Sequence, residues 1–506
     1  MKHPKIVIIG AGIAGLNAAL TLQGAGFAST IYESSGRVGG RMHSNTTTWN
    51  TNPPPNSQPL KSEWCGEFID TGQMTIMSLA SQFGLTLVDE VAAQPSGSTD
   101  TLFIRGAYYT QARADEDFGP VYAVLQKQLN ALPSQPITYN NANATGYFLD
   151  HLSIYEWIEK YVPGGHKSPL GLYLDSAYCQ EYGVDTPLQS SLNLVYLLGY
   201  QPGTYQPPGP WEIYGLSDER FSIAGGNQRL PEAIAAALPA GSVVTQSALT
   251  RIARMPNGQY ALTLKGVSGS RMAEADEVIL ALPFSVLRTL DYSSAGFDPL
   301  KITAIKELGY GTNTKLSLLF NNRYWNTAGP WGIGDGNIYT DLFFQDTWDS
   351  SRGLSNPNGL LTAYMGGTNA ASFTTVSSPY ATTTMGNTPR PSDPTVALPA
   401  KAILSLLNQV WPGVQAHWRG IAALSTPWSD PNLLGAYSCW TVGQYTKFAG
   451  YERVAQPAPP ATGKWPPGVG TCHFAGEHCS INYQGFMEGG AEEGARAANE
   501  IINKYT

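Results

Sequence analysis

Residues 6–33 read IVIIGAGIAGLNAALTLQGAGFASTIYE, and this stretch decides the fold. Residues 6–9 form a short apolar run rich in β-branched side chains, which is typical of a strand buried on both faces of a parallel sheet. Residues 10–15 then carry three glycines in the spacing G-x-G-x-x-G, and a helical pattern follows them. A second strand, residues 29–32, ends in Glu33. This order of strand, glycine turn, helix, strand and acid predicts a Rossmann-type dinucleotide-binding unit.

The glycines of this turn have separate physical roles. Gly10 permits the tight turn, Gly12 lets the backbone approach a pyrophosphate, and Gly15 lets the helix pack against the strand. Ala14 lies in the same turn, at the helix N-terminus that faces the phosphate charge. Glu33 follows Gly15 by 18 residues and is placed to accept hydrogen bonds from the adenosine ribose. An acid at this position disfavours a 2′-phosphate, but the turn leaves NAD and FAD open.

A second glycine-rich turn, Gly36-Arg37-Val38-Gly39-Gly40-Arg41, follows Glu33 almost at once. Its two arginines could neutralise a diphosphate buried beside the sheet. The motif GRVGGR after a Rossmann acid resembles the amino-terminal signature of the flavin-containing amine oxidase superfamily. This superfamily comprises monoamine oxidases, polyamine oxidases and L-amino-acid oxidases, and the resemblance recurs from Lys5 to Ile502.

The resemblance implies FAD as the cofactor, with its isoalloxazine extending away from the Rossmann glycines. It implies an α/β fold in the form of an α+β two-domain flavoprotein. The expected parts are a Rossmann-type FAD-binding domain of the glutathione-reductase-like kind, a mixed-sheet substrate domain and a helical insert. The length of 506 residues agrees with two to four structural units. We expect the FAD-binding domain to be discontinuous and assign the chain as follows: 1–70, 221–295 and 430–506 to the FAD-binding domain, 71–115 and 296–429 to the substrate domain, and 116–220 to the helical insert. A Pro- and Thr-rich stretch, 373–396, is interpreted as a surface loop.

Further cofactor contacts follow from the resemblance. The segment 63–70 resembles the part of the family that passes beneath the flavin ring, and the backbone of Val244 is expected to meet the adenine. Glu477 is expected at the ribityl or pyrophosphate region, and the N-terminal amides of the helix after Phe486 at the pyrimidine end. The contacts implied in this way are Arg37, Gly39, Gly40, Arg41, Gly66, Glu67, Phe68, Val244, Gly476, Glu477, Gly485 and Met487.

Lys315 is the predicted catalytic residue. It lies in the alternating, strand-like segment 310–320. A lysine in a strand is usually solvated, or reaches solvent with its amine. In the family, however, a lysine at this place holds a water against flavin N5. A cation near the reduced flavin would stabilise negative charge that develops on oxygen, which suits an oxidase that uses O2 directly.

Two aromatic side chains, Trp440 and Phe486, are predicted to hold the amine. The segment 435–440 resembles the monoamine oxidase segment in which an aromatic follows a cysteine. Two aromatic planes would exclude water and orient a neutral amine for hydride loss, although core packing is the ordinary role of either ring alone. Cys439 stands where monoamine oxidases attach their flavin covalently. Because the flanking Tyr437-Ser438 departs from their Gly-Gly pattern, we expect noncovalent FAD.

The favoured function is FAD-dependent L-amino-acid oxidase, because several longer phrases such as GAYSCWTVGQYT most resemble microbial members. Such an enzyme passes a hydride to flavin N5 and yields a 2-oxo acid, ammonia and hydrogen peroxide. It must anchor a carboxylate, normally with arginine, yet Ile69 stands where the snake-venom-type enzymes carry that arginine. The anchor is therefore open among Gln73, Gln345, Arg453 and a tyrosine donor.

Two other functions stay open. A monoamine or polyamine oxidase shares the chemistry without a carboxylate anchor, and Glu67 or Asp70 could then hold a second amine. A flavoprotein that binds without catalysis is the third hypothesis, and the presence of Lys315 and of both aromatic residues disfavours it.

Composition limits the partners. Hydrophobic residues make up 42% of the chain, which excludes general disorder, and the net charge of −8 argues against nucleic acid or an anionic membrane surface. A small-molecule amine or amino acid and O2 are the expected partners, and the family often forms homodimers. The five cysteines have no zinc-ligand spacing, so no metal site is predicted. The apolar run 6–22 is glycine-interrupted and predicts no membrane span, so we expect a soluble protein, cytoplasmic or exported after removal of a leader.

Overall fold

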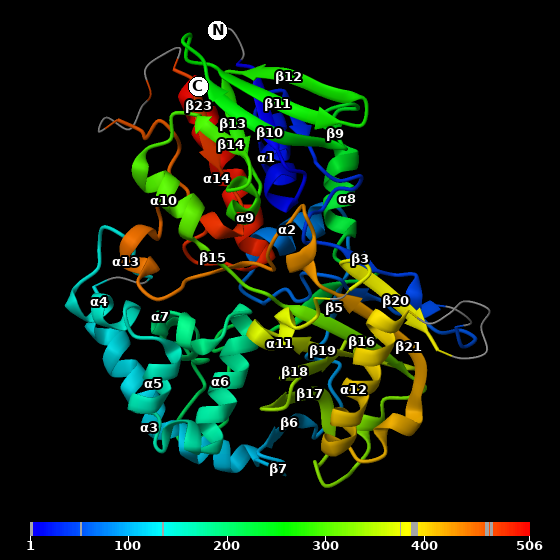
Figure 1. The fold of residues 1–506 in the computed structure, drawn as a ribbon. Helices are drawn as coiled ribbons and strands as arrows, with labels where there is room; N and C mark the ends of the chain where they lie inside the picture. The colour runs from blue at the N-terminus through cyan, green and yellow to red at the C-terminus, as the bar shows by residue number, and fades with distance from the viewer. Residues whose placement is uncertain are drawn as a thin grey trace.

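The computed structural model describes residues 4–50, 53–133, 136–374, 376–385, 393–460, 465 and 469–506. Three groups of secondary structure can be followed in Figure 1. A parallel sheet with its helices and a small antiparallel sheet lie at the top, a large sheet lies at the lower right, and a group of helices lies at the lower left. This mixed α/β architecture confirms the predicted fold class.

The sheet at the top has five parallel strands with β1 at its centre. All four residues of β1 are buried, as expected for an apolar strand with a neighbour on each side. The predicted order of strand, glycine turn, helix and strand is confirmed. In spatial order the strands are β23 (Thr471–Phe474), β13 (Glu277–Leu280), β1 (Ile6–Ile9), β2 (Ser29–Tyr32) and β9 (Val243–Val244), and the helices beside them are α1 (Ile13–Gly24), α8 (Arg229–Ala237) and α14 (Met487–Tyr505).

Gly15 lies where α1 passes close to β1. A Cβ atom at Gly15 would stand 2.0 Å from the carbonyl oxygen of Gly10 and 3.2 Å from Cγ2 of Ile8. We therefore expect Gly15→Ala to lower the free energy of unfolding by about 1–3 kcal/mol, because the backbone must shift to admit the methyl group. At Gly24, in the last turn of the same helix, a Cβ would meet no atom within 4 Å, so Gly24→Ala is the matched control. Thermal unfolding of the two variants checks this, and equal melting temperatures would contradict it.

The small antiparallel sheet begins beside the nucleotide-binding acid. The backbone N–H of Ser247 donates to the carbonyl oxygen of Glu33 at 2.7 Å, so β10 starts where β2 ends. Strand β10 pairs antiparallel with β11 and parallel with β14. The elements are β10 (Ser247–Arg254), β11 (Tyr260–Gly266), β12 (Gly269–Ala275) and β14 (Asp291–Ser294), with α9 (Phe284–Leu287) and α10 (Pro299–Glu307) nearby in the chain.

The large sheet has eight strands and carries the predicted catalytic lysine on β16. It is antiparallel apart from the β17–β6 pair. The prediction of a surface loop at 373–396 was wrong for 380–384, because these residues pair with 421–425 and form the edge strand β20. In spatial order the strands are β20 (Tyr380–Thr384), β21 (Trp418–Ser425), β16 (Thr314–Phe320), β19 (Gly359–Met365), β18 (Asp346–Asp349), β17 (Gly334–Thr340), β6 (Thr99–Ile104) and β7 (Ala107–Tyr108), and α11 (Gly367–Ala371) and α12 (Pro394–Val410) accompany them.

The helices at the lower left of Figure 1 arise from sequence with clear capping signals. Ser153 and Glu156 form a capping box at the start of α5, and Ser168 caps α6. Gly183 ends α6 in the left-handed conformation, next to Glu181 and Tyr182. The helices are α3 (Gln111–Ala131), α4 (Ala144–Asp150), α5 (Ile154–Tyr161), α6 (Pro169–Tyr182) and α7 (Ser191–Leu198). The assignment of exact domain boundaries stays a prediction.

Short elements connect these groups. Among the helices of the described residues, none combines the length and the apolar character needed to cross a membrane. The connecting strands and helices are β3 (Ser44–Asn45), β4 (Ser62–Glu63), α2 (Met74–Gln82), β5 (Leu87–Asp89), β8 (Phe221–Ile223), β15 (Gly309–Tyr310), β22 (Ser438–Cys439) and α13 (Gln444–Phe448), and the 3₁₀ turns are Thr48–Asn50, Gly165–Lys167, Thr186–Leu188, Tyr324–Asn326, Val414–His417, Pro427–Ser429 and Glu477–Cys479.

Candidate active site

A cavity of about 870 Å³ runs from the parallel sheet to the large sheet. At the first end it is lined by Gly10 and Gly12, where β1 gives way to α1. A Cβ at Gly12 would meet no atom within 4 Å, so this turn has an open face toward the cavity. The N-terminus of α1 is aimed at this space, which suits a phosphate group.

Glu33 lies at the same end and is held by backbone N–H groups. Its Oε2 accepts a hydrogen bond from the N–H of Ala11 and its Oε1 accepts one from Ser35, both at 2.8 Å. The side chain is buried yet lines the cavity, so it can also meet the ribose hydroxyls of a dinucleotide.

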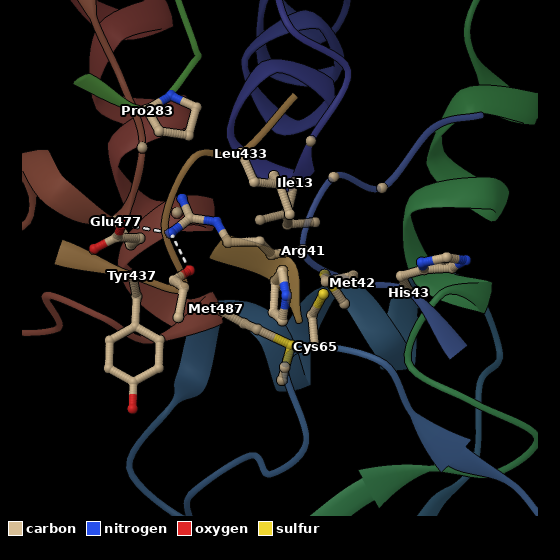
Figure 2. A pocket seen from close by; sticks show the side chains of 18 of the residues that line it. Ile13, Arg41, Met42, His43, Cys65, Pro283, Leu433, Tyr437, Glu477 and Met487 are labelled. Carbon is tan, nitrogen blue, oxygen red and sulfur yellow. Dashed lines mark hydrogen bonds and ion pairs between the residues drawn. The ribbon is translucent and has the colours of Figure 1, made fainter. Parts of the chain in front are cut away.

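Arg41 joins the second glycine turn to the carboxyl-terminal part of the chain (Figure 2). Its Nη1 donates to Oε1 of Glu477 at 2.7 Å and to the carbonyl oxygen of Ala436 at 3.1 Å. Oε2 of Glu477 accepts hydrogen bonds from the hydroxyl of Ser438 at 2.6 Å and from the N–H of Gly485 at 2.9 Å. Burial raises the pKa of Glu477, but the opposing attraction of Arg41 is among the contacts that hold this pKa below its usual range. Glu477 therefore fixes three segments around the middle of the cavity.

Most of the predicted cofactor contacts meet at this cavity. Gly15 and Val244 do not line it: Gly15 packs against Gly10, and the carbonyl of Val244 accepts the N–H of Glu33. The backbone following β9 reaches the cavity later, at 247–249. The predicted contacts that line it are Gly10, Gly12, Ala14, Glu33, Arg37, Gly39, Gly40, Arg41, Gly66, Glu67, Phe68, Gly476, Glu477, Gly485 and Met487.

These residues fit a flavin dinucleotide. The open face of Gly12, the helix N-terminus and Glu33 match a pyrophosphate and a ribose. His478 lines the cavity with both ring nitrogens buried and without a hydrogen-bond partner, as expected where a polar ligand completes the site. Figure 2 shows how Arg41, Met487 and Cys65 surround the middle of this space.

Lys315 lies on β16 and lines the cavity beyond the nucleotide end, with 6% of its surface exposed. Its Nζ donates to Oε2 of Glu67 at 2.8 Å, to the carbonyl oxygen of Cys65, and to that of Glu63 at 3.4 Å. The ammonium also stands 5.2 Å from the ring centre of Trp348. The sequence anticipated the position of the lysine but not its ion pair with Glu67.

The aromatic wall differs from the predicted pair. Phe486 lines the cavity, but Trp440 does not, because it packs in the core against Tyr445 and Phe448 with ring centres 5.0 and 5.8 Å away. Tyr437 lines the cavity instead, and its hydroxyl lies 3.1 Å from that of Tyr364. In this turn the aromatic side chain that lines the cavity, as Phe486 does, is therefore Tyr437, three residues before the predicted Trp440.

Cys439 also lies away from the cavity. It is fully buried, and Nδ2 of Asn193 lies 3.6 Å from its sulfur. In the same turn it is Ala436 that lines the cavity, and alanine offers no atom for a covalent bond to the flavin.

The two predicted glutamine contacts do not reach the cavity. Oε1 of Gln345 accepts the N–H of Gly366 at 2.7 Å, and Nε2 of Gln73 donates to Oδ2 of Asp70 at 3.0 Å. Arg453 is paired with Glu493 at 2.9 Å and is likewise absent from the cavity wall. Of the open anchors, only tyrosine side chains line the cavity within the described part of the chain.

Four carboxylates line the end of the cavity beyond Lys315, and we call them the acidic wall: Asp70, Glu181, Glu219 and Asp346. Burial raises the pKa of Glu181 to about 7, and Asp70 adds to the shift. Burial also raises the pKa values of Glu219 and Asp346 well above their usual range, and the neighbouring acids add to this. Only Asp70 was a candidate from the sequence. The other three come from α6, from the segment before β8 and from β18, and their sequence carries no motif that would join them.

Comparison with known proteins agrees with this geometry. The family model for flavin containing amine oxidoreductase matches residues 13–502. The L-amino-acid oxidase of Daboia russelii is 23% identical over 517 residues, covering 99% of this chain and 89% of its own. Polyamine oxidase 5 of Oryza sativa subsp. japonica is 22% identical over 524 residues, covering 98% and 87%. A solved structure of putrescine oxidase bound to putrescine is 17% identical with a TM-score of 0.75 over 99% of both chains, which shows a shared fold. The chain belongs to the flavin-containing amine oxidoreductase family, and FAD is its cofactor.

Proposed function

We propose that this protein oxidises primary amines that carry a second positively charged nitrogen, as diamines and polyamines do. The acidic wall carries the proposal. No lysine, arginine or histidine forms an ion pair with any of its four members among the residues that the structure describes. Carboxylates at a cavity wall without a partner cation are costly to ionise, which is why their pKa values are raised, so a cationic ligand supplies what this part of the protein lacks.

A neutral acceptor in the cavity wall leads to the same conclusion. Oε1 of Gln180 is buried without a hydrogen-bond donor, and Gln180 lines the cavity. An ammonium group brings three donors and no acceptor, so it complements this surface. A ligand that brings further acceptors does not.

A substrate carboxylate, by contrast, finds no free cation beyond the nucleotide end of the cavity within the described part of the chain. The arginines and lysines that line the cavity are Arg37, Arg41 and Lys315. Arg41 is paired with Glu477 and Lys315 with Glu67, while Arg37 donates to the carbonyls of its own glycine turn, at the nucleotide end. Ile69 is fully buried in the core and contributes nothing to the cavity.

The parts of the site then divide the work. FAD, when bound, supplies the hydride acceptor and delivers the electrons to O2. Tyr437 and Phe486 line the cavity where two rings can exclude water and orient the amine that reacts. The acidic wall attracts the distal ammonium and thereby positions the reacting carbon. The products are an aminoaldehyde, ammonia and hydrogen peroxide.

An L-amino-acid oxidase is the second candidate, because relatives such as the Daboia russelii enzyme carry that name. Nε1 of Trp348 supports it, since this buried donor lines the cavity without a partner and suits a carboxylate oxygen. On this reading the acidic wall favours basic amino acids over neutral ones.

Product analysis tests the proposal. Cadaverine and L-lysine differ only in the α-carboxylate, and both carry the distal amine. We expect faster peroxide formation with cadaverine, together with 5-aminopentanal. Faster turnover of L-lysine, with a 2-oxo acid as the product, would establish the second candidate instead. No peroxide from either compound would overturn both.

We further propose that the FAD is held noncovalently, since Cys439 is buried outside the cavity lining and Ala436 stands at the cavity wall. Acid precipitation of the purified protein is expected to give a colourless pellet and to release all flavin into the supernatant. Flavin that stays with the pellet would indicate a covalent bond, for which Cys65 is the thiol-bearing residue at the cavity wall within the described segments.

A further inference from the structure

We infer that Glu67 is a positioning residue that fixes Lys315 and cancels its charge, so that the cavity presents a neutral ion pair to the cofactor. Nζ of Lys315 and Oε2 of Glu67 are 2.8 Å apart. Both side chains are buried and both line the cavity. This inference does not depend on which amine is oxidised.

The hydrogen bonds of Lys315 support a fixed position. An ammonium group has three N–H donors. Here they have three protein acceptors: the carboxylate of Glu67 and the carbonyl oxygens of Cys65 and Glu63. The segment 63–67 therefore wraps around the ammonium, and Lys315 holds no spare donor.

A second layer keeps this segment in place. Nδ2 of Asn227 donates to the carbonyl oxygens of Gly66 at 3.0 Å and Glu67 at 2.7 Å, and its backbone N–H donates to Oε1 of Glu63 at 2.9 Å. Asn227 itself is fully buried. The carboxylate of Glu67 thus sits on a backbone that can move little.

The charges behind the pair include no cation that could replace Lys315. Lys61 lies 3.7 Å from Glu63 and donates to the hydroxyl of Ser222, which donates to Glu90 at 2.6 Å. This buried group holds one cation and two acids, so it leaves no uncompensated positive charge near Lys315.

Opposite effects of the two partners follow. Glu67→Gln leaves the lysine charge uncompensated, which favours electron uptake by the cofactor and the binding of anions to it. Lys315→Met leaves a buried carboxylate, which disfavours both. The double variant Lys315→Met/Glu67→Gln is neutral again and returns toward the wild type.

The affinity of the holoenzyme for sulfite, measured by bleaching of the flavin absorbance, tests this without turnover. We expect Glu67→Gln to tighten sulfite binding by about tenfold or more, Lys315→Met to weaken it by a similar factor, and the double variant to lie within about threefold of the wild type. The flavin reduction potential should rise in Glu67→Gln, fall in Lys315→Met and return toward the wild-type value in the double variant. Glu232→Gln, on the surface of α8, is the control. The inference would be overturned if both single variants changed the sulfite affinity in the same direction, or if the double variant lost as much affinity as the two single losses combined. Either result is expected if Glu67 has only a structural role.

Discussion

The triple variant Glu181→Gln/Glu219→Gln/Asp346→Asn is expected to lose about a hundredfold in kcat/KM for cadaverine, while kcat/KM for n-pentylamine changes by less than about threefold. Removing the acids that face a buried ammonium costs several kcal/mol in binding that charge. n-Pentylamine has the same reacting amine and chain length but no distal charge, so it does not use the acidic wall. Initial rates of peroxide formation with both amines give the comparison.

The melting temperature of the triple variant distinguishes this loss of substrate selectivity from damage to the fold. The three acids have raised pKa values because burial and mutual repulsion disfavour their charged forms. Neutralising them should therefore leave the melting temperature unchanged or higher. Glu274→Gln, at an exposed position of β12, is the control substitution. An equal loss of kcat/KM for both amines would mean that the acidic wall shapes the cavity but does not recognise the distal charge.

Selectivity should also depend on pH. Because the pKa of Glu181 is raised to about 7, the wall gains charge as the pH rises from 6 to 8. The ratio of kcat/KM for cadaverine to that for n-pentylamine should rise over this range and stay flat in the triple variant. The same raised pKa makes the folded protein bind more protons than the unfolded chain between about pH 4.5 and 7, so Glu181 contributes less stability as the pH rises.

Glu477→Ala is expected to give the largest loss of stability, about 3–5 kcal/mol, and loss of FAD on gel filtration. The substitution leaves the half-buried Arg41 without its carboxylate partner and removes the acceptor of Ser438 and Gly485. Ser438→Ala, which removes a single hydrogen bond to the same carboxylate, should cost only about 1 kcal/mol. Thermal unfolding of both variants and their flavin content check this, and a Glu477→Ala protein that keeps both would contradict it.

The sign of the pH effect at Glu477 is opposite to that at Glu181. Burial raises the pKa of Glu477, but attraction to Arg41, attraction to His478 and the hydrogen bond from Ser438 outweigh burial and lower it. Its contribution to stability is therefore complete above about pH 4.5 and is lost as the pH falls through the lowered value.

The nucleotide end was predictable because local sequence determines it. One continuous stretch, residues 6–33, contains the strand, turn, helix and acid. The two strands that flank this helix in the chain, β1 and β2, also pair directly in the sheet. The fold class followed from the same stretch together with the family resemblance.

The substrate end was not predictable in the same way. Tyr437 faces the cavity because the next two residues form β22 against β15 and Ser438 bonds to Glu477, which fixes the turn. The sequence comparison centred on Cys439 and so favoured Trp440, three residues too far along. The acidic wall joins residues 70, 181, 219 and 346, and only the packing of four separate segments brings them together.

On the proposed function, the cavity selects a second positive charge rather than a carboxylate. Anaerobic flavin reduction by n-pentylamine, cadaverine, L-norleucine and L-lysine checks this selectivity, because these four compounds vary the distal amine and the α-carboxylate independently. We predict that cadaverine has the highest second-order rate constant of flavin reduction. The distal amine should accelerate reduction in both the amines and the amino acids, and the α-carboxylate should slow it whether or not the distal amine is present. Faster reduction by L-norleucine than by n-pentylamine, with no gain from the distal amine, would contradict the account.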